Sequence, residues 1–257
     1  MSKQAEHARR FRELHRKGDP LILFNVWDAG SAKVVAETGA QALATGSWSV
    51  AAAHGFEDGE KIPLTLALAN LQRIVAAADL PVTADLESGY GDVGATVQQA
   101  IRLGAIGFNL EDSIASKREL YSVEAQCERI RYARASADGI VAGAFINART
   151  DVFLIAHPSE HTDEMVTTAL ERARAYADAG ADGFFVPGLI DEGKIARVCA
   201  ESPLPVNVMA RPGATPPPRF AELGVARVSY GPHPYRIAMD ALREAALAAQ
   251  RSESSRQ

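Results

Sequence analysis

The stretch RLGAIGFNLED, residues 102–112, contains the pattern that decides the fold. A helix ends at Gly104, and a short apolar strand follows and ends in two acidic residues. Glycine readily adopts the left-handed conformation that closes a helix before a tight loop. A helix-to-strand unit that recurs along a chain predicts parallel strands joined by helical crossovers. The same unit is repeated in ETGAQALATG (37–46), DAGADGFFV (178–186) and ELGVARVSY (222–230).

Eight apolar runs of this kind can be assigned as strands, and amphipathic runs with three- and four-residue apolar spacing separate them. Eight βα units close a barrel, and 257 residues is an ordinary length for one. An open, doubly wound sheet is the alternative, but the strand count and the chain length favour the barrel. The expected strands are residues 21–28, 42–46, 81–87, 106–112, 141–151, 182–187, 205–210 and 227–231.

We therefore predict an α/β protein with one domain over residues 1–257, a single (β/α)8 TIM-type barrel with an extra N-terminal helix. The polar segment 1–20 is expected to form that helix and to pack outside the barrel. Residues 251–257, which include SESSRQ, are expected to be a disordered tail.

The composition excludes several classes of protein. The net charge of −5 and the isoelectric point near 5.7 argue against a nucleic-acid-binding protein, which needs a basic surface. No apolar run approaches the roughly 20 residues of a membrane span. The only two cysteines, Cys127 and Cys199, lie in helical patterns, which fits a reduced, cytoplasmic protein.

Acidic residues gather at the predicted strand ends, where barrel enzymes carry their chemistry. Asp85 and Glu87 are two residues apart, so both side chains point to one side of the strand. Glu111 and Arg149 end the next two strands, and Asp58 lies in the loop after the second strand. Carboxylates at one mouth repel each other unless a cation lies among them, and oxygen ligands without His or Cys suit Mg2+ or Mn2+. Arg149 adds a two-pronged donor for a substrate carboxylate.

Two other interpretations of these residues exist. Each acid, taken alone, is as well explained as a helix cap or a solvated loop charge. The motif GYGDVG (89–94) also matches the G-x-G-x-x-G fingerprint of dinucleotide-binding proteins. The strand before it ends in two acids, however, and these would repel a pyrophosphate. We therefore favour the metal site.

The sequence resembles the isocitrate lyase and phosphoenolpyruvate mutase superfamily over nearly its whole length. Members of that superfamily fold as α/β barrels, hold Mg2+ through acids, largely by way of water, and form or capture a pyruvate-like enolate. The resemblance is carried by TADLESGYGD (83–92), together with LFNVWDAGSAKVVAETGA (23–40), ATGSWSVAAAHGFEDGE (44–60), GFNLEDS (107–113) and INARTDVF (146–153).

The resemblance implies a role for each candidate residue. Asp58 resembles a loop aspartate that reaches the metal or the substrate, and Arg149 would bind the substrate carboxylate. The implied metal-site acids are Asp85, Glu87 and Glu111, and the other implied substrate-binding residues are Thr45, Gly46, Ser47 and Asn207.

The loop after Glu111 departs from the superfamily pattern. The lyases carry there a Lys-Lys-Cys-Gly-His-like motif whose cysteine is the general acid, whereas this chain has SIASKRELYS (113–122) without cysteine or histidine. Lys117 resembles the loop lysine of the phosphonate-forming mutases, although no asparagine follows it. It is thus the catalytic candidate on this loop.

We therefore expect a Mg2+-dependent enzyme that stabilises the enolate of a small 2-oxo acid. A C–C bond lyase or decarboxylase acting on an oxaloacetate-like or 2-hydroxy diacid fits best, because CO2 leaves without help from a loop acid. One alternative is P–C bond chemistry, as in a phosphoenolpyruvate mutase or phosphonopyruvate hydrolase. Another is a protein that binds a 2-oxo acid without turnover.

The resemblance also implies a homo-oligomer, either a tetramer or a dimer, because superfamily members commonly pack or exchange their C-terminal helices. PYRIAMDALREAALAAQ (234–250) is apolar enough for such packing. It is equally suited to be the eighth helix of its own barrel.

Overall fold

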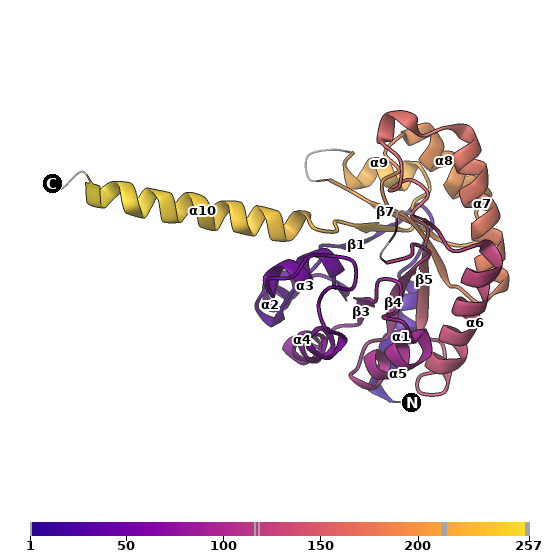
Figure 1. Ribbon diagram of the computed structural model, residues 1–257, viewed down its shortest axis with the longest axis horizontal. Helices are drawn as coiled ribbons and strands as arrows, with labels where there is room; N and C mark the ends of the chain where they lie inside the picture. The colour runs from indigo at the N-terminus through magenta and orange to yellow at the C-terminus, as the bar shows by residue number, and fades with distance from the viewer. Residues whose placement is uncertain (1, 116, 118, 212–214, 255–257) are drawn as a thin grey trace.

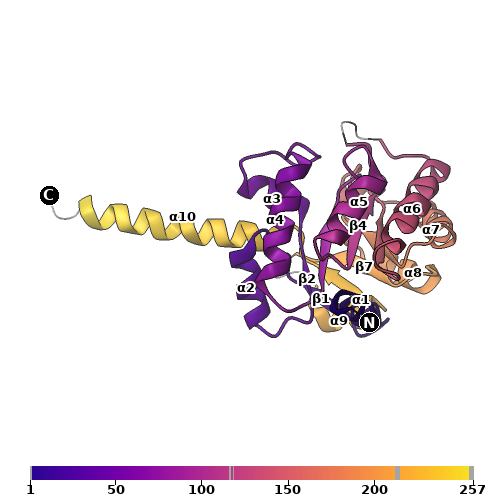
Figure 2. The ribbon, with the colours of Figure 1, turned by 90° about the horizontal axis from the view of Figure 1, so that it is seen from below.

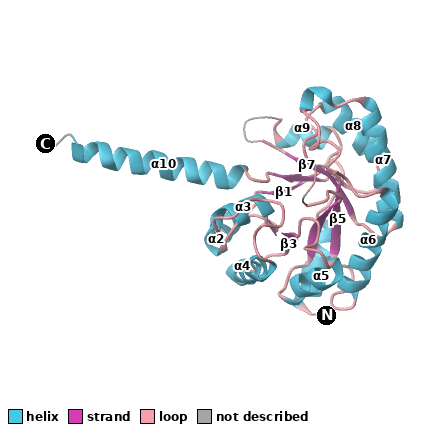
Figure 3. Ribbon diagram, in the orientation of Figure 1, coloured by secondary structure: helices cyan, strands magenta, loops and turns pink. Residues whose placement is uncertain are grey.

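The computed structural model describes residues 2–115, 117, 119–211 and 215–254. Eight parallel strands curl into a barrel with helices around it (Figure 1), and Figure 3 shows the strands at the centre of that ring. The neighbour order is β1-β8-β7-β6-β5-β4-β3-β2, which confirms the predicted barrel. The strands are β1 (Leu21–Leu23), β2 (Leu43–Ala44), β3 (Val82–Asp85), β4 (Gly107–Glu111), β5 (Phe145–Arg149), β6 (Gly183–Val186), β7 (Val206–Met209) and β8 (Arg227–Ser229).

The helices lie between these strands in the predicted order. The predicted helix ends at Gly39, Gly104, Gly180 and Gly224 are confirmed, since all four have φ between 82° and 108°. None of the described helices is long and apolar enough to cross a membrane. The barrel helices are α2 (Ala29–Glu37), α3 (Ser47–Ala53), α4 (Leu64–Ala77), α5 (Val93–Arg102), α6 (Val123–Asp138), α7 (Asp163–Asp178), α8 (Glu192–Glu201) and α9 (Pro217–Glu222).

The barrel is nearly closed, and its open side lies between β1 and β2. No ladder joins these two strands; a single parallel bridge pairs Val26 with Thr45. The buried side chain of Asn25 spans the same side, because its amide donates to the Thr45 carbonyl and its oxygen accepts from the amides of Tyr230 and Gly231. β1 and β2 are therefore shorter than the predicted 21–28 and 42–46.

The N-terminal helix is confirmed as α1 (Lys3–Glu13), and it packs at the N-terminal end of the strands (Figure 2). Its Phe11 is fully buried and meets the ring of Phe145, the first residue of β5, edge-on at 5.4 Å. The guanidinium of Arg227, the first residue of β8, lies over Phe11 at 5.9 Å. α1 thus covers the end of the barrel away from the predicted site.

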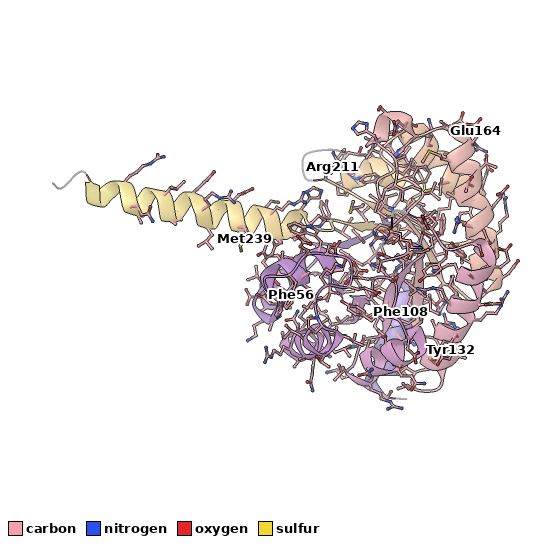
Figure 4. All side chains as sticks on the ribbon, in the orientation of Figure 1. Phe56, Phe108, Tyr132, Glu164, Arg211 and Met239 are labelled. Carbon is pink, nitrogen blue, oxygen red and sulfur yellow. The ribbon has the colours of Figure 1, made fainter. Side chains whose placement is uncertain are left out.

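The last helix, α10 (His233–Ser254), projects from the barrel (Figure 1). Figure 4 labels Met239 on the part of α10 nearest the body and Phe108 within the barrel. Residues 251–254 are helical, so this part of the expected tail is not disordered, because the helix continues through it; residues 255–257 lie outside the described residues. Ile22 on β1 and Phe24, just after this strand, are 38% and 39% exposed.

Candidate active site

A cavity of about 250 Å³ opens at the C-terminal ends of the strands. Its polar side includes Asp58, Asp85 and Arg149, which the sequence predicts to lie together. Its other side is formed by an apolar wall, which we define as Leu154, Phe185, Pro187, Met209 and Pro232. The remaining lining residues are Asn25, Gly46, Ser47, Trp48, Asn109, Ser229 and Gly231.

Asp85, the last residue of β3, is fixed by its neighbours on one side only. Its amide donates to the Thr45 hydroxyl at 2.8 Å, and its Oδ2 accepts from the Ser47 amide, at the start of α3, at 3.1 Å. Its Oδ1 is buried and has no hydrogen-bond partner among the described residues. Because an unsatisfied buried acceptor is costly, this oxygen is suited to a cation.

Asp58 adds a second negative charge beside Asp85. Burial, and then the nearby charge of Asp85, raise the pKa of the Asp58 carboxyl group, while Arg149 and a hydrogen bond from Ser47 oppose the shift. A cation beside the two carboxylates would offset the effect of burial and of the neighbouring charge on Asp58. This donor set of hard oxygens therefore fits Mg2+ or Mn2+.

The acids do not converge tightly. Across the part of the chain that the structure describes, no three His, Cys, Asp or Glu side chains are grouped so that they could hold a metal ion by themselves. The expected binding of Mg2+ by few carboxylates, with water supplying many of the ligands, stays a prediction.

Glu87 is buried, and the protein occupies both of its oxygens. Oε2 accepts from the Glu60 amide at 2.6 Å, and Oε1 accepts from the Tyr90 hydroxyl at 2.8 Å. Burial raises the pKa of Glu87 to about 7, although the bond from Tyr90 opposes the shift. Its predicted role as a metal-site acid stays a prediction.

Glu60 completes a hydrogen-bonded network between the Asp58 loop and the turn after β3. One of its oxygens, Oε1, accepts from the Ser88 hydroxyl at 2.6 Å and from the Tyr90 amide at 2.7 Å. We call Glu60, Glu87, Ser88 and Tyr90 the Glu60 network. Glu60, Glu87 and Tyr90 have φ of 61°, 51° and 52° and are the described non-glycine residues with positive φ. Each such conformation costs about 1–2 kcal/mol.

Glu111 and Arg149 form an ion pair. Nη1 of Arg149 lies 2.8 Å from Glu111 Oε2, while Nε and Nη2 donate to the two oxygens of Asp151 at 2.6 and 2.9 Å. Burial raises the pKa of Glu111, and the charge of Arg149 opposes this. A guanidinium has five N–H groups, and two of them donate to Asp151. The guanidinium therefore has further donors that could bind a carboxylate.

The other predicted residues lie at different distances from the cavity. Gly46 and Ser47 line it, whereas Thr45 lies behind Asp85 beside a smaller cavity of about 30 Å³. Asn207 is buried outside the cavity lining and accepts from the Ser229 hydroxyl at 3.2 Å. Lys117 is 58% exposed and lies 3.8 Å from Glu119. The substrate-binding roles of Thr45 and Asn207 and the catalytic role of Lys117 stay predictions.

Sequence reasoning missed several lining residues. Asn109 stands two residues before Glu111, and its oxygen accepts from the Asn147 amide. The two-residue alternation that placed Asp85 and Glu87 on one side of a strand would have found it. Leu154, Phe185 and Met209 have no such signal, since apolar residues at strand ends are usually core.

Fold and cavity together define a (β/α)8 barrel whose mouth carries acids and an arginine. The chain belongs to the phosphoenolpyruvate mutase and isocitrate lyase superfamily: residues 11–249 match the family described as phosphoenolpyruvate phosphomutase. This confirms the resemblance seen in the sequence.

Three similar proteins indicate the range of chemistry in the family. A solved structure of a putative phosphonomutase from Burkholderia cenocepacia J2315 is 55% identical, with a TM-score of 0.92 over 96% of this chain and 99% of that one. The 2-methylisocitrate lyase of Escherichia coli is 31% identical over 87% of this chain and 77% of its own. The oxaloacetate decarboxylase of Pseudomonas entomophila is 30% identical over 94% of this chain and 84% of its own. The family therefore does not by itself name the bond that is broken.

Proposed function

We propose that this protein is a Mg2+-dependent cytoplasmic enzyme that breaks a C–C bond in a small 2-oxo or 2-hydroxy diacid and stabilises the enolate. Decarboxylation of an oxaloacetate-like substrate fits the site best. Enzymes of the superfamily are typically Mg2+-dependent. The observation that carries the proposal is the buried Oδ1 of Asp85, which has no hydrogen-bond partner among the described residues, while Asp85 lines a cavity together with Asp58 and Arg149.

The chain's own groups would bind and orient such a substrate. Bound beside Asp85, Mg2+ would supply positive charge near the ketone oxygen, where negative charge grows as the bond breaks. The end of the Arg149 guanidinium would hold the C1 carboxylate and so fix the plane of the 2-oxo acid. Asp58, on its loop, would cover the open side of the cavity and limit the access of water.

The apolar wall supports decarboxylation over other C–C cleavages. In decarboxylation, the C3–C4 bond breaks, its electron pair moves to the ketone oxygen, and neutral CO2 leaves. A carboxylate placed against apolar side chains loses charge in this step, so the wall favours the transition state over the ground state. Among the described residues that line the cavity, Arg149 is the one cationic side chain, so a third substrate carboxylate would lack a partner.

Two alternative functions remain as proposals. P–C bond chemistry, as in a phosphoenolpyruvate mutase or phosphonopyruvate hydrolase, is supported by the high identity to the putative phosphonomutase. The same site would then stabilise the same kind of enolate. A non-catalytic protein that binds 2-oxo acids is supported by the Lys117 loop, which lacks the lyase motif.

Pyruvate release by the purified protein with Mg2+, with and without EDTA, tests the proposal. The substrates are oxaloacetate, 2-methylisocitrate, dimethylmalate and phosphonopyruvate. We expect pyruvate from oxaloacetate above the spontaneous rate, and we expect EDTA to abolish it. Pyruvate from phosphonopyruvate alone would establish the P–C alternative, and phosphorus NMR would detect a rearrangement that releases none. Binding of oxalate without any turnover would establish the non-catalytic alternative.

We further propose a homo-oligomer, a dimer or tetramer, in which α10 of one protomer packs on its partner. The side chains of Ile237, Leu242 and Leu247 on α10 are 50%, 62% and 45% exposed. Ile22 on β1 and Phe24 just after it are exposed as well. A helix with apolar residues in water needs a partner surface. The outer face of β1 offers a matching apolar surface.

Substituting aspartate for both Ile237 and Leu242 should convert the oligomer to a monomer, because burying two carboxylates in an apolar interface is unfavourable. Size-exclusion chromatography with light scattering measures the mass. Arg243→Ala, on the same helix at a residue paired with Asp240, is the matched control and should leave the mass unchanged. A monomeric parent protein at micromolar concentration would contradict the proposal.

A further inference from the structure

The Asp58 loop reaches the cavity from outside the barrel wall, so its position depends on what holds it. The loop joins α3 to α4, and Glu57 is exposed at its tip beside Asp58. It is anchored on its far side by Ile62, which is 1% exposed and packs with Val50 and Ala51. Between the tip and this anchor stands Glu60, which has no such packing.

Glu60 connects the loop to the turn after β3 by three hydrogen bonds. Its amide donates to Glu87, and its Oε1 accepts from both the Ser88 hydroxyl and the Tyr90 amide. Those partners also carry the turn that follows Asp85. The contacts therefore join the two segments that carry Asp58 and Asp85.

The backbone conformation indicates that this connection has a function beyond packing. The three left-handed non-glycine residues of the described chain, Glu60, Glu87 and Tyr90, all belong to the Glu60 network. Strained conformations of this kind persist where surrounding contacts hold them, and they cluster at functional sites. Here the contacts that hold them are the hydrogen bonds of the network itself.

A second group supports the turn from the side opposite the loop. The Arg129 guanidinium donates to the Ser88 carbonyl, and it lies 4.1 Å over the ring of Tyr121, at the end of the Lys117 loop. Glu60, Ser88, Tyr121 and Arg129 all line one surface cavity beside the site. The turn is therefore held between α6 and the Asp58 loop.

We propose that Glu60 is a positioning residue that holds Asp58 over the cavity through the Ser88 hydroxyl and the Tyr90 amide. The expected effect on catalysis rests on the function proposed above. The expected effect on the position of the Asp58 loop does not depend on that function. Because both bonds end on one oxygen, the Glu60 side chain acts as a hydrogen-bond acceptor, and its charge is not required.

The test compares Glu60→Ala with Glu60→Gln in the full-length protein. Gln keeps an amide oxygen that can accept both bonds, whereas Ala removes the acceptor. Hydrogen exchange of the amides in residues 57–62 should quicken in Glu60→Ala and stay near that of the parent in Glu60→Gln. Glu57→Ala, at an exposed residue of the same loop, is the matched control and should change neither exchange nor turnover.

Turnover supplies the second readout. Glu60→Ala should lower kcat about 10- to 100-fold with a smaller change in KM, since a small misplacement of a catalytic group has effects of this size. Glu60→Gln should restore most of the loss. Equal loss in both variants, or unchanged exchange in Glu60→Ala, would overturn the proposal. If the parent turns over no substrate, the exchange comparison still decides whether Glu60 holds the loop, while the proposed function fails separately.

Discussion

Asp85→Ala should lower kcat/KM by about 10³-fold or more, equivalent to roughly 4 kcal/mol of lost transition-state stabilisation. The substitution removes a carboxylate that lines the cavity and whose buried Oδ1 has no partner in the described part of the chain. It should also abolish saturable Mg2+ binding, measured by isothermal titration calorimetry. The barrel should stay folded, because Asp85 ends a strand at the mouth, and its loss removes a charge that repels Asp58.

Asp85→Asn tests whether Asp85 acts through its negative charge or through its shape and hydrogen bonds. The amide keeps the volume and can still accept from the Ser47 backbone N–H, so the start of α3 should stay in place. Activity should nevertheless be lost as in Asp85→Ala, because a neutral amide binds Mg2+ weakly. Full activity of either variant would remove the metal site from the proposed function.

Arg172→Ala should destabilise the protein by about 3–5 kcal/mol, because it leaves a buried carboxylate without its ion-pair partner. Asp112 is fully buried, and its Oδ2 accepts from Arg172 Nη1 at 3.0 Å and from the Tyr176 hydroxyl at 2.8 Å. For a protein of this size the melting temperature should fall by roughly 10 °C. Differential scanning calorimetry measures it.

Two further variants test whether the unpaired charge of Asp112 causes the loss of stability in Arg172→Ala. Arg174→Ala, at a 55% exposed arginine on the same helix, should change stability by less than about 0.5 kcal/mol. Adding Asp112→Asn to Arg172→Ala should restore part of the loss, since no charge is then buried alone. A larger loss in the double variant would contradict the prediction.

The defect of Arg172→Ala should also depend on pH. Burial already raises the pKa of Asp112 in the folded protein, and losing Arg172 removes a charge that lowers it. The folded variant then binds a proton at Asp112 more tightly than the unfolded chain does. Its stability relative to the parent should therefore fall as pH rises from the unfolded pKa through the folded one. A defect that is the same at pH 5 and pH 8 would mean that lost packing is the cause.

The barrel and part of the site could be predicted from the sequence because their signals are local. The glycines at 39, 104, 180 and 224 mark helix ends whatever the rest of the chain does. Asp85, Arg149 and Asp58 were predicted to share one mouth because parallel strands in a barrel all end on one side. These three line one cavity, as predicted.

Other features depend on contacts between distant segments and could not be predicted. Glu60 looks like an ordinary loop acid until the fold places it against Ser88, 28 positions away. Whether Glu87 faces a metal or the protein depends on the Tyr90 hydroxyl, whose direction no spacing rule gives. The course of α10 likewise could not be predicted, and under the oligomer proposed above it would depend on the surface of a second protomer.

The single bridge between β1 and β2 gives this side less strand pairing than the laddered pairs of strands around the rest of the barrel. The free energy needed to separate two segments locally is lower where few hydrogen bonds and contacts join them. Asn25 belongs to one edge of this gap and Gly46–Ser47 to the other, and all three line the cavity. A ligand that contacts both edges would link β1 to β2 where their backbones pair least. If the substrate binds in this cavity as proposed, its binding should also stabilise this side of the barrel.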